Sequence, residues 1–115
     1  MLGKVIVSKF WTQFFSLGKA QAITIFPFIF LLHKNDRQNK TLLNHERIHI
    51  YQALELLVIP FYVWYLTEFL VRLILVQNVH RAYLEISFEQ EAYKNDQDMS
   101  YLQKRKVFDF LKYLS

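Results

Sequence analysis

Turn-forming residues are scarce in this chain. It contains two glycines and two prolines among 115 residues, and these residue types most often end helices and strands or build irregular loops. A chain with so few of them is expected to fold into a small number of long elements. Because 115 residues with 53% hydrophobic side chains are enough to bury one core, we expect a single domain over residues 1–115.

The absence of cysteine limits the chemistry open to the chain. It excludes disulfides, thiolate metal sites and cysteine nucleophiles, so any metal site must use histidine and carboxylate ligands. The net charge of +4 would suit an anionic partner, but the basic residues are scattered and 17% of the chain is aromatic, which argues against nucleic-acid binding. The first residues lack the apolar run of a signal peptide, and a cytoplasmic location is therefore expected.

The first forty residues favour β-structure, because β-branched and aromatic residues dominate at 5–7, 11–15 and 22–32. Pro27 cannot donate a hydrogen bond to a neighbouring strand, so the strand that contains it is expected at a sheet edge or at a bulge. The polar run 33–40 is typical of a solvated loop, and Thr41 then stands where a helix cap is expected.

The remainder of the chain favours helices. Breaks are expected near Pro60, near residues 77–78 and near residues 95–98. These breaks predict about four helices, over 41–58, 60–76, 78–95 and 99–114. The predicted fold class is therefore α+β, with a short N-terminal β-sheet followed by a helical bundle.

The segment 54–76 is apolar enough to be weighed as a membrane span. Three charges interrupt it, and its uncharged part, from Leu56 to Thr67, is shorter than the roughly 20 residues that a span needs. We therefore expect this segment to form buried core and not to cross a bilayer, with peripheral membrane association as the alternative.

The sequence His45-Glu46-Arg47-Ile48-His49 is the strongest chemical pattern in the chain. Two histidines four residues apart on a helix project from one face, so both imidazoles can bind one tetrahedral zinc ion. Glu46 points about 100° round the helix, beside the ion, where a carboxylate can take a proton from zinc-bound water. The pattern predicts His45 and His49 as zinc ligands and Glu46 as a general base.

A third ligand must come from elsewhere in the chain. If one helix separates the second histidine from the next acidic cluster, a rise of about 1.5 Å per residue brings Glu89 back to the level of His49. Glu89 shares a helix face with Ile86 and Ala92, which is the apolar side, and we expect it to be the third ligand. The other candidates are expected on the surface: Glu91, paired with Lys94, and the histidines His33 and His80.

These motifs resemble those of a known family. The pattern from His45 to His49, followed by Glu89-Gln90-Glu91-Ala92, is similar to the two zinc motifs of the gluzincin metallopeptidases, and its spacing looks like that of the membrane-bound metallopeptidase domains of β-lactam sensor proteins. The resemblance implies a zincin-like bundle and zinc-dependent hydrolysis of a peptide or protein substrate. It also implies an edge strand that pairs with the substrate backbone, which would contain Phe28, Ile29 and Phe30.

One position departs from the family pattern. Tyr93 stands where many relatives have an aspartate that hydrogen-bonds the first histidine, so the support of the ligands is expected from Asn44, Gln52 or Asn95. Tyr83 and Tyr93 are the candidates for donating a hydrogen bond to an oxyanion. Two alternatives stay open: a zinc-binding scaffold without turnover, and a small membrane protein in which the histidine motif is accidental.

Overall fold

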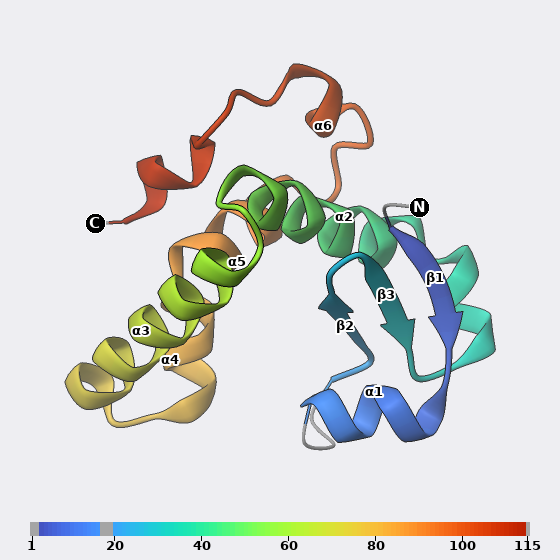
Figure 1. Cartoon of the computed structure of the whole chain (residues 1–115), viewed down its shortest axis with the longest axis horizontal. Helices are drawn as coiled ribbons and strands as arrows, with labels where there is room; N and C mark the ends of the chain where they lie inside the picture. Colours follow the sequence, from blue (N-terminus) through green and yellow to red (C-terminus); the bar gives the residue numbers. More distant parts are fainter. Residues whose placement is uncertain (1–2, 17–19, 115) are drawn as a thin grey trace.

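The computed structural model describes residues 3–16 and 20–114, and its architecture is α+β as the sequence predicts. The sheet lies at one end of the molecule and the helices α3 to α5 at the other, with α2 between them (Figure 1). The strands are β1 (Lys4–Val7), β2 (Ala22–Ile25) and β3 (Phe28–Leu31). The helices are α1 (Lys9–Ser16), α2 (Lys40–Glu55), α3 (Ile59–Val76), α4 (Val79–Glu85), α5 (Ser87–Asn95) and α6 (Tyr101–Lys104), with 3-10 turns at Lys34–Gln38 and Asp109–Tyr113.

The sheet has the strand order β1-β3-β2, with β3 parallel to β1 and antiparallel to β2. The prediction of one edge strand over 22–32 is wrong, because the chain turns at Phe26–Pro27 and forms two strands. Phe28, Ile29 and Phe30 lie in the central strand, both of whose edges are already paired. They therefore cannot pair with a substrate backbone, and within the described residues the edge strand on the helical side of the sheet is β2.

Residues 11–15, which were expected to form a strand, lie in helix α1. Phe10 and Phe14, and likewise Trp11 and Phe15, are four positions apart, which is a helical spacing. Because aromatic side chains also favour strands, composition alone predicted the wrong element. The hydroxyl of Ser8 accepts a hydrogen bond from the Trp11 backbone N–H at 3.1 Å and caps the helix. Local capping and spacing therefore outweigh the strand propensity here.

Helix α2 runs through the middle of the molecule and is buried on two sides. Ile50 packs with Ile29 and Leu31 of β3 on one side, and Ala53 packs with Phe88 of α5 on the other. The helix begins at Lys40 because the side chain of Asn39 accepts a hydrogen bond from Leu42 N–H at 3.1 Å, so the cap predicted at Thr41 is wrong. This central position holds the histidine motif away from bulk water.

The break predicted near residues 77–78 is confirmed, but the helix predicted over 78–95 is interrupted. Gln77 adopts a left-handed conformation with φ of 57°, and the chain turns back as α4. Ile86 is extended, because the backbone N–H and the hydroxyl of Ser87 both donate to the Glu68 carboxylate of α3 instead of continuing the helix. The interruption starts a new helix, α5, which leads back toward α2.

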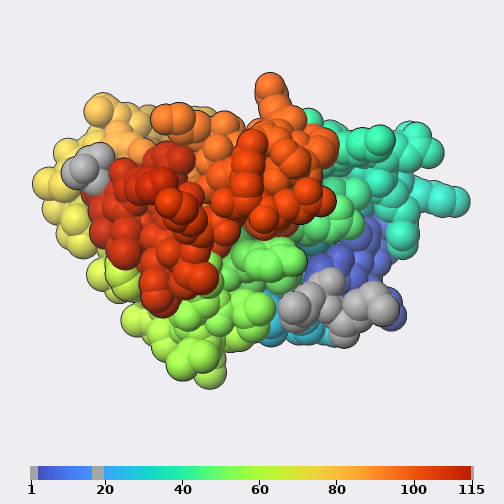
Figure 2. Space-filling model, turned by 90° about the horizontal axis from the view of Figure 1, so that it is seen from above, coloured from blue at the N-terminus to red at the C-terminus, as the bar shows by residue number. Residues whose placement is uncertain are grey.

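The single helix predicted over residues 99–114 is wrong. The structure has α6, then Phe108 in a left-handed conformation with φ of 62°, then a 3-10 turn. Tyr101 and Phe110 are both buried, in different apolar clusters. Nine positions along one straight helix would put them on opposite faces, at about 100° per residue, so the chain must break to bury both. Seen from above, this C-terminal segment lies over the middle of the molecule (Figure 2).

The expectation that the segment 54–76 forms buried core is also wrong. Phe61 is the one residue of α3 that is buried. The helix packs against α4 and α2 with its inner side, and it lies at the edge of the molecule (Figure 1).

Candidate metal centre

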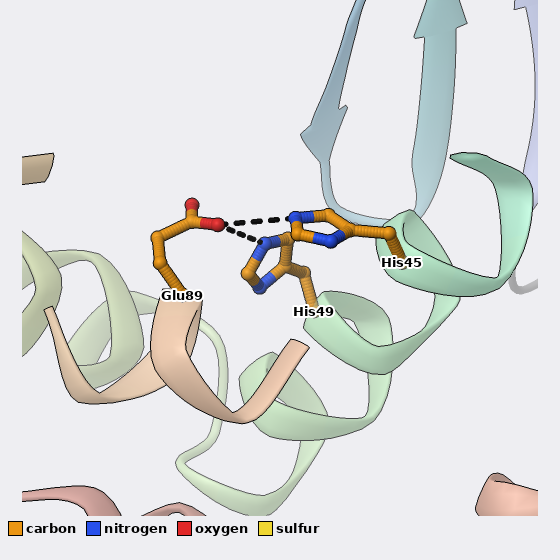
Figure 3. Close-up of side chains that lie close together, drawn as sticks. All are labelled: His45, His49 and Glu89. Atoms are coloured by element: carbon orange, nitrogen blue, oxygen red, sulfur yellow. Dashed lines mark hydrogen bonds and ion pairs between the residues drawn. The ribbon is translucent and has the colours of Figure 1, made fainter. Parts of the chain in front are cut away.

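The structure brings together the three residues that the sequence predicts as metal ligands. His45 and His49 lie on α2, and Glu89 reaches them from α5 (Figure 3). Their ligand atoms all lie within 4.8 Å of one another, and the three side chains are buried. Glu89 Oε1 is 3.1 Å from His45 Nε2 and 3.1 Å from His49 Nε2. A tetrahedral ion with bonds of about 2.1 Å holds its ligand atoms roughly 3.4 Å apart, and both distances to Glu89 are close to this value.

Each histidine uses its other ring nitrogen for a hydrogen bond within the protein. Nδ1 of His45 donates to Asp96 Oδ2 at 3.0 Å, and Nδ1 of His49 donates to Gln52 Oε1 at 2.8 Å. Both acceptors lack a proton, and this fixes the Nδ1–H tautomer of each neutral ring. In that tautomer two Nε2 lone pairs and a carboxylate oxygen converge, an arrangement that requires a proton or a cation between them.

The charges of the site agree with this requirement. Burial opposes protonation of His49, but the Glu89 carboxylate beside it prevails and raises the pKa of His49 to about 9. Burial would likewise raise the pKa of Glu89, but the two histidines hold it well below its usual value. The cluster therefore stabilises one positive charge, which a divalent cation can supply in place of the proton.

The support of the ligands differs in part from the sequence prediction. Gln52, one of the three residues expected to support the ligands, accepts a hydrogen bond from His49. His45 is held by Asp96, which sequence reasoning missed. Asn44 supports Asp96 indirectly, because its amide donates to the Asp96 backbone carbonyl at 2.9 Å, and Asn95 bonds the Glu91 carbonyl instead. A signal for Asp96 was present: it follows Glu89 by seven positions, which is two helical turns on the same face.

Glu46 lies beside the cluster and is not part of it. Its Oε1 accepts a hydrogen bond from the hydroxyl of Thr24 at 2.7 Å. Thr24 belongs to β2, so this contact ties the edge strand to the helix that carries the histidines. One carboxylate oxygen of Glu46 is thus held, and the carboxylate borders the same cavity as the histidines.

A cavity of about 1120 Å³ opens in front of the cluster. It lies between the strand β2, the ligand face of α2 and the helices α3 to α5. Among the residues that line it are the strand residues Ile23, Thr24 and Ile25, the motif residues His45, Glu46 and His49, and the aromatic residues Phe61, Tyr62, Tyr65, Phe69, Tyr83 and Tyr93. The cavity is large enough for a short extended peptide.

Three tyrosines place hydroxyl groups at the site. The Tyr65 hydroxyl donates to Glu89 Oε2 at 2.5 Å, which leaves Oε1 to face the histidines. The hydroxyls of Tyr83 and Tyr93 lie 2.8 Å apart. Burial, and then the negative charge of Glu89, raise the pKa of Tyr65 and of Tyr83, so both hydroxyls keep their protons. Sequence reasoning singled out Tyr83 and Tyr93 but missed Tyr65, which is aligned with buried Phe61 one turn earlier on α3.

Glu91, the alternative third ligand, lies outside the cluster and is fully buried. The expected surface pair with Lys94 is wrong, because the Glu91 carboxylate accepts hydrogen bonds from Gln52 Nε2 at 2.9 Å, from the Tyr101 hydroxyl at 2.6 Å and from Arg105. Glu91 therefore acts on the site through Gln52, which holds His49.

The two remaining histidines, His33 and His80, are exposed, as the sequence predicts. His80 lines the outer part of the cavity. Neither belongs to the group of side chains that could share one ion.

No protein family, curated protein or solved structure matches the chain. The likeness to gluzincins therefore rests on the motif residues themselves.

Glu89→Ala is expected to weaken zinc binding by at least about 100-fold. Loss of an outer hydrogen-bond partner of a metal ligand lowers affinity by about 10- to 100-fold, and loss of a ligand should exceed that. Competition with a chelator of known affinity would measure the effect. Glu85→Ala, which removes a partly exposed carboxylate paired with Arg81 on the preceding helix, is the matched control and should bind zinc as the wild type does. Equal affinities of the two variants would exclude Glu89 as a ligand.

Proposed function

We propose that this protein is a zinc-dependent peptidase with a zincin-like fold, in which His45, His49 and Glu89 bind the metal and Glu46 is the general base. The observation that supports it most is the convergence of two Nε2 atoms and one carboxylate oxygen, with a second carboxylate beside them. Two histidines and one glutamate are a donor set that catalytic zinc uses, and three protein ligands leave a fourth position for water.

Bound zinc would polarise the scissile carbonyl and lower the pKa of the attacking water toward 7. Glu46 accepts the proton of that water and delivers it to the leaving amine. Since the Thr24 hydroxyl already occupies Oε1, the proton moves through Oε2. The hydrogen bond from Thr24 also fixes the rotation of the carboxylate, so the free oxygen keeps one direction.

The Tyr83–Tyr93 pair is suited to bind the oxyanion that forms during hydrolysis. Two hydroxyls carry two protons, and the contact between them uses one. One O–H thus stays free to donate to a negatively charged oxygen in the cavity. Tyr65 is less suited, because its proton already goes to Glu89.

The substrate that fits this cavity is an extended peptide. The outer edge of β2 borders the cavity and pairs with no strand in the described residues, but the Tyr62 hydroxyl bonds the Phe26 N–H and the Thr24 carbonyl at one end of it. A substrate backbone that displaces this hydroxyl can add to the sheet there. The proposal thus assigns to β2 the role that the resemblance to gluzincins implied for Phe28, Ile29 and Phe30. Across the cavity, Phe61 and Phe69 form an apolar wall, which favours substrates with a large apolar side chain.

Metal analysis and peptide cleavage together test the proposal. The purified protein, loaded with zinc and freed of excess metal, should hold one zinc per chain and cleave members of a mixed library of quenched fluorescent peptides. A chelator should abolish cleavage and added zinc should restore it, with His45→Ala as the variant that binds no metal. A full zinc equivalent without cleavage of any peptide would identify a metal-binding scaffold, and a protein that binds no zinc would refute the proposal.

A further inference from the structure

Helix α3 exposes an almost entirely apolar surface over half of its circumference. At about 100° per residue its exposed residues span an arc of about 180°. We call this surface the outer face of α3; it consists of Ile59, Pro60, Val63, Leu66, Thr67, Leu70, Val71, Ile74 and Leu75. Ile74, near the free end of the helix, is 71% exposed. The helix is also long and apolar enough to cross a membrane by length and composition.

The two charged residues of α3 lie at the border of the outer face, where they line a hollow together with Val63, Thr67 and Val71, and each is bonded to another part of the chain. Glu68 accepts a hydrogen bond from the Ser87 backbone N–H at 2.8 Å, and Arg72 donates to the Leu114 carbonyl at 3.0 Å. The one polar residue of the outer face, Thr67, donates its hydroxyl to the Val63 carbonyl at 2.7 Å. A surface helix of a soluble protein has the opposite arrangement, with its charges outward and its apolar side inward.

We propose that the outer face of α3 docks into the surface of a lipid bilayer and makes this a peripheral membrane protein. A protein partner would be a poor match for this face. Protein interfaces contain about one hydrogen bond per 100–200 Å², whereas the side chains of the outer face can contribute no donor and a single acceptor, the Thr67 hydroxyl oxygen. Hydrocarbon requires none, and it favours a surface whose polar groups are bonded internally.

A second element supports a bilayer as the partner. Helix α1 exposes Phe10, Trp11 and Phe14 next to the exposed Lys9, and aromatic rings beside a basic residue are typical of helices that lie at a membrane surface. Helix α1 and the free end of the α3–α4 hairpin lie on the same side of the molecule, the lower side in Figure 1. One bilayer can contact both, and the net charge of +4 suits anionic lipid.

The geometry fits docking better than crossing. The inner half of α3 contains Glu68 and Arg72 and packs against α4. Helix α4 carries two further charged residues, Arg81 and Glu85. Full immersion would carry all four charges into hydrocarbon. Docking immerses the outer face alone and leaves α4 and α5 in place, so that Glu89 stays beside the histidines.

Flotation with vesicles of equimolar phosphatidylcholine and phosphatidylglycerol tests the proposal. The wild-type chain should float with the vesicles, and Ile74→Glu should lower the bound fraction by about tenfold or more, because it puts a charge into the docked face. The matched control is Val107→Glu, a site that is 69% exposed on the C-terminal segment; it should bind as the wild type does. Circular dichroism and zinc binding would verify that both variants fold, because no residue of the outer face belongs to the metal site.

A fluorescent label gives a second measurement. The chain has no cysteine, so a polarity-sensitive dye on Ile74→Cys reports that position alone, with Val107→Cys as the control. When vesicles are added, the emission maximum of the dye at position 74 should move to shorter wavelength, and that of the dye at position 107 should not. Failure of the wild type to float, or equal flotation of Ile74→Glu, would refute docking. A dimer in sedimentation equilibrium that Ile74→Glu dissociates, without vesicle binding, would assign the face to a second copy instead. These outcomes are independent of whether the metal site is catalytic.

Discussion

Glu46→Gln is expected to retain zinc and the native fold while peptide hydrolysis falls by about 10²- to 10⁴-fold or more. Glutamine is nearly isosteric with glutamate, and its carbonyl oxygen can still accept the hydrogen bond from Thr24 that Glu46 accepts at 2.7 Å. The three ligand atoms are untouched, since Glu46 lies outside the cluster. Glutamine cannot accept the proton of the attacking water, and the chemical step should slow without a comparable loss of substrate binding.

Steady-state kinetics on the best library peptide would measure the effect, with metal content determined on the same samples. His45→Ala should lose both zinc and activity, which separates a ligand from a base. Thr24→Val should keep the metal and lose less activity than Glu46→Gln, because it frees the carboxylate without removing it. If Glu46→Gln cleaves as fast as the wild type, Glu46 is not the base.

The cluster of His45, His49 and Glu89 could be predicted because much of its geometry is local and periodic. The spacing of His45 and His49 fixes their common face on any helix. Glu89 followed from one intervening helix and from the apolar neighbours that mark an inward face. The break at Gln77 was also predictable, since Asn78 is a good cap and its side chain accepts from Arg81 N–H at 2.9 Å.

Helical spacing indicated Gln52 and Asp96, but the other contacts around the cluster could not be predicted, because they depend on how distant segments pack. Glu91 is buried by a C-terminal segment that was expected to form one helix over residues 99–114. The edge strand was misplaced for a similar reason: β1 pairs with β3 across more than twenty residues, and nothing in the local pattern of Phe28 to Phe30 indicates that partner.

The apolar content of α3 was equally uninformative about its surroundings. The apolar side chains of Leu70 and Ile74 predict an environment without water, but composition does not distinguish a protein core from a lipid surface. The proposal of a lipid surface rests on the charged residues, because Glu68 and Arg72 are bonded to other parts of the chain and the outer face carries no charge.

Arg105→Met is expected to destabilise the fold by about 3–5 kcal/mol. The side chain of Arg105 is 3% exposed, and its guanidinium group bonds the carboxylates of Glu55 and Glu91, which come from α2 and α5. Removing it leaves two carboxylates close together, one fully buried and one nearly so, without a countercharge. Loss of one partner of a buried ion pair has this magnitude because the remaining charge keeps its desolvation penalty.

Urea denaturation of the zinc-free protein would measure the loss of stability. Lys104→Met is the matched control, since Lys104 is the preceding residue and its pair with Asp98 is exposed, with an expected effect of about 1 kcal/mol or less. Combining Arg105→Met with Glu91→Gln should recover part of the loss, because it removes the buried charge that Arg105→Met leaves unpaired. Zinc affinity should follow the same order, since Glu91 orients Gln52 and Gln52 orients His49. If Arg105→Met were as stable as Lys104→Met, the C-terminal segment would not be docked on α2 and α5, and the support it gives to His49 through Gln52 would be absent.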